Sequence, residues 1–89
     1  MQHLHIDTSK TVRLLYHLLG KVQPRLAEYV RPEDHFVRDW GFPPKDHHAY
    51  VNLLEQHFQI EIQEGDRREM QSIQLTVDFL LRQVNAYPN

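Results

Sequence analysis

The chain has 89 residues, which is enough for one domain and too few for two. It contains no cysteine, which excludes disulfides, thiolate nucleophiles and thiolate metal sites. The formal net charge of −2 is too small to favour nucleic acid or anionic membranes as partners. No apolar run is long enough to span a bilayer, and the N-terminal residues lack the apolar stretch of a signal peptide. We therefore expect a soluble cytoplasmic protein with a single domain over residues 1–89 and a core at about 8–86.

A first helix is predicted to begin after three residues that are good helix caps, Asp7, Thr8 and Ser9. Apolar residues then recur at three- and four-residue spacing, which is typical of one buried helix stripe. The stripe consists of Val12, Leu15, Leu19 and Val22. Pro24 disfavours helical geometry in the residue before it, so the helix should end between residues 20 and 23.

Residues 24–46 form a long connection that contains four prolines together with several large apolar side chains. Because such side chains need burial, we expect this segment to pack across the helices as an ordered loop. Trp40 and Phe42 flank Gly41. Core packing is the simpler interpretation of both rings, and the alternative is an exposed Phe42 that anchors a partner.

The second helix is predicted to begin near Pro44, because a proline suits the first helical turn. Its buried face is expected to contain Tyr50, Val51, Leu54 and Phe58. Residues 59–62 alternate between polar and apolar and should be extended. Gly65 should then turn the chain, and Asp66 should cap a short helix over residues 67–70.

Ser72 is predicted to cap a last helix, and Pro88 lies beyond its end. The residues spaced for its buried face are Ile73, Val77, Leu80, Leu81 and Val84. An antiparallel bundle lets each amphipathic helix cover its apolar stripe against the others. The sequence therefore predicts an all-α fold, a four-helix bundle with three longer helices, a short third helix and a long ordered loop between the first two.

Three segments together resemble the acyl carrier protein family. Residues 30–41, VRPEDHFVRDWG, resemble the family pattern V-x-P-x-x-x-F-x-x-D-L-G, with Trp40 in place of the leucine. Residues 54–62, LEQHFQIEI, resemble L-E-x-x-F-x-I-E-I, and residues 73–80 resemble the start of the family's last helix. The resemblance covers roughly residues 10–84 and implies a bundle of the acyl carrier protein type.

The resemblance fails at the residue that carries the family's chemistry. Family carriers attach 4′-phosphopantetheine to a serine that follows the Asp-x-Gly turn, and the matching position here is Pro44. Proline has no hydroxyl and cannot form the phosphodiester. The two serines of the chain, Ser9 and Ser72, are interpreted as helix caps. We therefore predict that the protein has no covalent cofactor.

The resemblance implies a docking surface on the second helix, at Phe42, Lys45, His48 and Asn52. This helix is typically acidic in the family, whereas here it is nearly neutral, so the partner should differ in charge. The leading hypothesis is a non-carrier, acyl carrier protein-like module that binds a protein partner in acyl-thioester metabolism of the fatty-acid or polyketide type. The alternatives are a non-covalent binder of acyl chains or small molecules, and a true carrier modified at an unusual hydroxyl.

Catalysis and metal binding have less support in the sequence. No nucleophile is accompanied by a supporting base, and we predict that the protein is not an enzyme. Seven histidines raise the possibility of a zinc site, with His3 and His5 or the pair His47 and His48 as ligands. Adjacent residues on a helix point in different directions, and no metal-binding spacing is present, so we predict no metal site.

Overall fold

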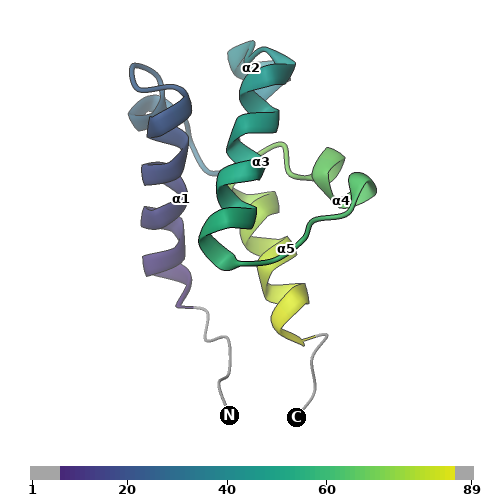
Figure 1. Cartoon of the computed structure of the whole chain (residues 1–89). Helices are drawn as coiled ribbons and strands as arrows, with labels where there is room; N and C mark the ends of the chain where they lie inside the picture. Colours follow the sequence, from purple (N-terminus) through teal and green to yellow (C-terminus); the bar gives the residue numbers. More distant parts are fainter. Residues whose placement is uncertain (1–6, 86–89) are drawn as a thin grey trace.

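The computed structural model describes residues 7–85 and is built from helices, as predicted (Figure 1). The described residues contain no β-strand. In chain order the elements are α1 (Thr8–Val22), the 3-10 turn η1 (Ala27–Tyr29), α2 (Phe36–Trp40), α3 (Pro44–Phe58), α4 (Glu64–Glu69) and α5 (Ile73–Asn85).

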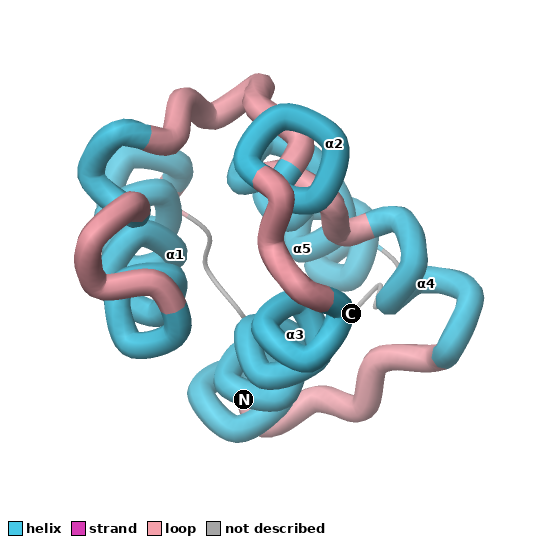
Figure 2. Tube along the Cα trace, turned by 90° about the horizontal axis from the view of Figure 1, so that it is seen from above, coloured by secondary structure: helices cyan, strands magenta, loops and turns pink. Residues whose placement is uncertain are grey.

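Three long helices form the body of the molecule. Helix α1 packs against both α3 and α5, and it runs antiparallel to them (Figure 1). The view along the helices shows α2 over one end of the body, next to α3, and α4 at the side away from α1 (Figure 2). The two short helices therefore contact different parts of the three-helix body, α2 on α3 and α4 on α5.

The predicted stripes of α1 and α3 are confirmed in part: the almost fully buried members are Leu15, Leu19, Tyr50, Val51 and Leu54, whereas Val12, Val22 and Phe58 are only partly buried. Each stripe follows the helical period, so one face of each helix lies against its neighbours.

In α5 the prediction is correct for Ile73, Val77 and Leu80 and wrong for Leu81, which is 36% exposed. Leu81 is turned about 100° around the helix from Leu80, which takes it off the buried face. The side chain of Val84 and all of Pro88 lie outside the described part of the structure.

The crossover between α1 and α3 is ordered, as predicted, but it contains η1 and α2 instead of irregular loop alone. Helix α2 is capped reciprocally: His35 Nδ1 accepts a hydrogen bond from the Arg38 N–H at 2.9 Å, and Asp39 Oδ2 accepts one from the His35 N–H at 2.7 Å. Just before α2, Asp34 Oδ2 accepts hydrogen bonds from the Arg31 N–H at 2.8 Å and from Trp40 Nε1 at 2.9 Å. The His35 and Asp39 side chains therefore satisfy backbone donors at the start of a five-residue helix, and Asp34 fixes the chain that leads into it.

The caps of the longer helices agree with the sequence. Asp7 Oδ1 accepts a hydrogen bond from the Lys10 N–H at 3.1 Å at the start of α1. Ser72 Oγ accepts one from the Leu75 N–H at 3.0 Å at the start of α5. The prediction that short side chains cap these helices is confirmed for Asp7 and Ser72 and wrong for Thr8 and Ser9, which lie in the first turn of α1 instead of before it.

The segment between α3 and α5 differs from the prediction in two places. Gln59 has a left-handed backbone with φ of 54°, so it ends α3 instead of starting an extended run. Helix α4 begins at Glu64, so Gly65 and Asp66 lie inside its first turn and do not form a turn and cap before it. Acidic residues in a first turn interact favourably with the helix dipole, which accounts for the earlier start.

Gly41 ends α2 with a left-handed φ of 68°, and an added Cβ would meet no atom within 4 Å. The cost of Gly41→Ala is therefore conformational, and we expect it to lower the free energy of unfolding by about 1 kcal/mol. Gly20 has equally open surroundings inside α1, where alanine is a better helix former than glycine. Gly20→Ala should therefore raise the free energy of unfolding by about 0.5–1 kcal/mol. Urea denaturation of both variants tests this, and equal stabilities would contradict it.

Candidate functional site

The exposed side of the first half of α3 contains most of the residues that the sequence selected. Pro44, Lys45 and His48 are exposed, and Asn52 is half-buried. Lys45, His48 and Asn52 are spaced by three and four residues, which places them on one side of the helix. We call these four residues the α3 face.

Phe42 does not belong to this face. It is only 2% exposed, and its ring stacks on that of Phe36 with a centroid separation of 5.5 Å. Phe36 in turn meets the Tyr50 ring edge-on at 5.1 Å. The possibility that Phe42 is an exposed anchor is therefore wrong, because its ring fills the core between α2 and α3.

The start of α3 is built by two consecutive prolines. Pro43 has an extended backbone and serves as the N-cap, and Pro44 is the first helical residue, where the missing N–H is not needed. The side-chain amide of Gln23 donates a hydrogen bond to the Asp46 carboxylate, which joins the first turn of α3 to the end of α1. The exposed Pro44 ring offers no group that could be acylated or phosphorylated at this position.

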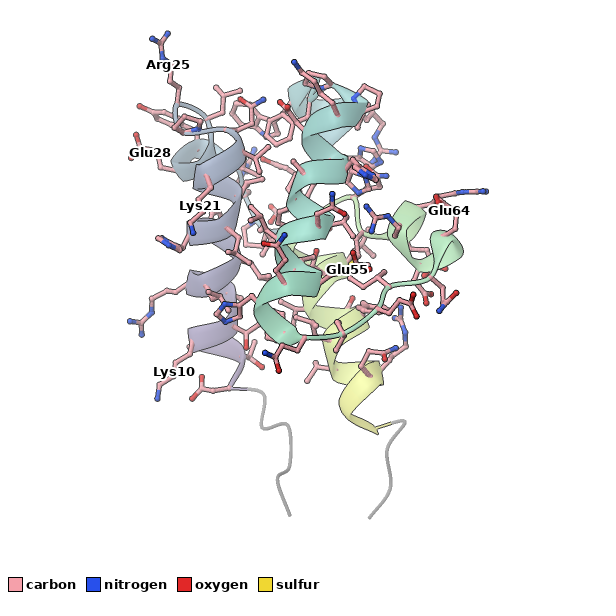
Figure 3. The ribbon with its side chains drawn as sticks, in the orientation of Figure 1. Lys10, Lys21, Arg25, Glu28, Glu55 and Glu64 are labelled. Carbon is pink, nitrogen blue, oxygen red and sulfur yellow. The ribbon has the colours of Figure 1, made fainter. Side chains whose placement is uncertain are left out.

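Arg67 of α4 lies against the α3 face and connects the two helices. Its Nη2 donates to Nδ1 of His48 at 2.9 Å and to Oδ1 of Asn52 at 3.0 Å. Its Nη1 donates to Oε1 of Glu55 at 3.2 Å, and Oε2 of Glu55 accepts a hydrogen bond from the Ile62 N–H at 2.8 Å. We call this group the arginine clamp, made of His48, Asn52, Glu55 and Arg67; Glu55 lies between α3 and α4 in Figure 3.

The clamp constrains what the α3 face can do. The Arg67 side chain is only 13% exposed, so the guanidinium is largely shielded from water. A guanidinium has only donors, and His48 Nδ1 must therefore be unprotonated to accept from it, with the proton on Nε2. His48 keeps its Nε2–H and Asn52 its amide group for an external partner.

The role of Arg67 was not predicted from the sequence. A signal was present in α3 itself, where His48, Asn52 and Glu55 offer acceptors on one side of the helix at spacings of four and three. A row of acceptors on one helix, followed by an arginine in the next helix, is the pattern that would have indicated the clamp.

His47 makes a second connection between α3 and the end of α4. Its Nε2 donates to the Met70 carbonyl oxygen at 2.8 Å. Burial lowers the pKa of His47, the hydrogen bond to Met70 opposes this effect, and the nearby Arg67 guanidinium adds to the lowering. The ring is therefore held in its neutral form more strongly in the folded protein than in the unfolded chain.

This depressed pKa predicts acid sensitivity. As the pH falls below the unfolded value of about 6.5, the unfolded chain takes up a proton that folded His47 resists, so stability declines until the folded pKa is passed. His47→Gln keeps an N–H donor and cannot titrate, so its free energy of unfolding should fall less between pH 7.5 and 5. Urea midpoints at both pH values measure the difference, and an equal decline in both proteins would contradict the assignment.

The hydroxyl groups near the core are already engaged. Thr76 Oγ1 donates to the Ser72 carbonyl oxygen at 2.9 Å, so the Tyr50 hydroxyl must donate to Thr76 Oγ1, also at 2.9 Å. Burial raises the pKa of Tyr50, which keeps its proton in place for this chain of bonds. Ser9 is exposed, but it lies in the first turn of α1, and α1 begins at the end of the molecule opposite to the start of α3 (Figure 1).

In residues 7–85 no group of three histidine, aspartate or glutamate side chains is arranged to hold a metal ion. His3 and His5 lie outside the described residues. None of the helices that the structure describes is both long enough and apolar enough to cross a membrane.

The fold and the site together define a small all-helical domain with a polar helix face that is tied to a short neighbouring helix. Comparison with models of known protein families found no match to this chain, and comparison with curated proteins also found none.

Proposed function

We propose that the protein is an acyl carrier protein-like binding module that carries no phosphopantetheine and docks a protein partner on the α3 face. The observation that carries the proposal is Pro44, exposed at the start of α3 in the position where the resembled family has its modified serine. The partner would be a protein of acyl-thioester metabolism, as the resemblance implies.

The order and directions of the helices support the proposal. A long helix, an ordered crossover, a second long helix, a short helix and a last long helix follow one another as the resemblance requires. The motif residues of the crossover also have structural roles that explain their pattern: Asp39 caps α2 and Gly41 ends it. A scaffold of this type can persist when its attachment residue is replaced, because Pro44 suits the first turn of α3.

The loss of the arm is tested by intact-mass spectrometry after incubation with CoA and a phosphopantetheinyl transferase. We expect no mass increase for the natural chain, and a carrier protein in the same reaction controls for transferase activity. Pro44→Ser restores a hydroxyl at the start of α3 and is the informative variant: its modification would support descent of this surface from a carrier. Modification of the natural chain would overturn the proposal.

Docking on the α3 face is tested by placing a photo-crosslinking amino acid at Lys45 or, as a control, at Gln74, which is exposed on α5. We expect one discrete crosslinked product in cells from position 45 and none from position 74. Substitution of His48 by alanine in the same chain should weaken the product, because the ring is exposed beside Lys45. Equal products from both positions, or none from either, would contradict the proposed docking site.

A further inference from the structure

The outer side of α1 is a row of basic side chains that plays no part in the proposed docking on α3. Lys10, Arg13, His17 and Lys21 are all exposed and follow one another at spacings of three and four. At 100° per residue they fall within an arc of about 80°, on the side of α1 opposite to its buried leucines. We call these four residues the basic stripe.

The charge of the chain is divided unevenly around this stripe. Residues 8–25 contain four lysines and arginines and no acidic residue, whereas residues 26–89 contain six lysines and arginines against eleven acidic residues, a net charge of −5. Lys10, Lys21 and Arg25 lie at the α1 edge of the molecule together with Glu28, and Glu64 lies at the opposite edge beside α4 (Figure 3). Among the described residues, none of the stripe's side chains takes part in an ion pair: the four that occur involve other cations.

A surface hollow of about 630 Å³ adjoins the middle of the stripe. Its lining residues are Arg13, Tyr16, His17, Pro24, Ala27 and Glu28. The Tyr16 hydroxyl donates to the Val30 carbonyl oxygen at 2.5 Å, so this wall of the hollow is held against the crossover. The apolar part of this wall suits an apolar side chain and Arg13 suits a flanking carboxylate, whereas Glu28 would repel one.

From the unpaired stripe and the adjoining hollow, we propose that α1 is a second docking surface, and that its partner is an acidic, amphipathic helix of another protein. Lys10 and Lys21 are 11 residues apart on α1, which is about 16 Å along the helix axis. A partner helix of the same length has three turns and would present one carboxylate per turn to the stripe. An apolar residue of the partner would occupy the hollow beside Tyr16. The complementary charges would steer the encounter and set the register of the two helices.

A protein segment fits better than a polyanion. Nucleic acids and anionic membranes present extended negative charge, and the net charge of −5 on residues 26–89 would be repelled by it. A single partner helix would contact only the basic stripe. Its repulsion by the acidic remainder of the molecule would be weak, because salt screens charges over about 8 Å under physiological conditions. The acidic remainder of the molecule therefore favours a compact acidic partner.

The test uses fluorescence anisotropy with a labelled 20-residue amphipathic helical peptide that has one glutamate per turn along one side and a central leucine. The natural chain should bind this peptide, and the affinity should fall as salt is raised. A matched peptide with glutamine in place of glutamate should bind at least about tenfold more weakly. Absence of binding at millimolar protein and low salt would overturn the proposal.

Two charge-reversal variants locate the surface. Arg13→Glu with Lys21→Glu should weaken peptide binding at least about tenfold. The control, Arg38→Glu with Arg68→Glu, makes the same change in net charge at exposed positions of α2 and α4 and should change the affinity less than about twofold. If both variants lost the same amount of peptide affinity, the cause would be the overall net charge, and the assignment of the docking surface to α1 would be overturned.

Other occupants are distinguished in the same assay. A single-stranded dT20 oligonucleotide and vesicles containing phosphatidylserine replace the peptide at equal salt. The choice of a protein partner would be overturned if the oligonucleotide or the vesicles bound more tightly than the peptide and the Arg13→Glu, Lys21→Glu variant lost that binding. Sedimentation velocity of the chain alone should show a monomer, and self-association lost in that same variant would make a second copy the occupant instead.

Discussion

Replacing Phe36 with alanine should lower the free energy of unfolding by about 3–5 kcal/mol, the largest single effect that we expect in this domain. The side chain is fully buried and contacts two other rings, stacked on Phe42 and edge-on to Tyr50. Its removal would leave a cavity where α2 covers α3, and it would also remove aromatic contacts that add to simple burial. A domain of this size is stable by only about 5–10 kcal/mol, so a large part of that stability would be lost.

The adjacent residue offers a matched control. Val37 belongs to the same short helix and is 40% exposed, so Val37→Ala should change stability by less than about 0.5 kcal/mol. Urea unfolding followed by circular dichroism measures both variants, and Phe36→Leu provides a milder substitution if the alanine variant does not fold. Similar stabilities for Phe36→Ala and Val37→Ala would show that α2 does not contribute to the core as described.

The long helices could be predicted from sequence because their signals are local. Periodic burial marks α1 and α3, and Asp7 and Ser72 cap their helices through side chains only three residues from the donor. The short helices lack enough turns to show a period, and isolated helices of five or six residues are not stable on their own. Helix α2 exists because His35 and Asp39 satisfy its free backbone groups and Phe36 is drawn into the core.

The candidate site was predictable only in part, because some of its contacts are local in the sequence and others join distant residues. The positions of Lys45, His48 and Asn52 on one side of α3 follow from the helical period, and the start at Pro44 follows from proline geometry. The partner that His48 and Asn52 meet is 15 or more residues away in the chain, on a helix whose start was predicted three residues too late. Burial of Phe42 likewise depends on where α2 places Phe36, which no local pattern specifies.

Replacing Arg67 with alanine should lower the free energy of unfolding by about 1–3 kcal/mol, because it leaves Oε1 of Glu55 and Oδ1 of Asn52 without their donor in a partly buried position. The neighbouring Arg68 is exposed, so Arg68→Ala removes the same charge and should cost less than about 0.5 kcal/mol. Arg67→Lys restores the charge but not the planar fork, in which one nitrogen reaches Glu55 and the other reaches His48 and Asn52, so it should recover only part of the loss.

Hydrogen exchange separates a local role of the clamp from a global one. If the clamp holds α4 against α3, the amides of α4 should exchange faster in Arg67→Ala than in Arg68→Ala, while those in the centre of α1 follow global stability alone. The consequence for docking is direct, since release of Arg67 frees Nδ1 of His48 and the Asn52 side chain on the α3 face. Unchanged protection of α4 in Arg67→Ala would show that packing alone positions this helix, and that a partner could bind the α3 face without displacing it.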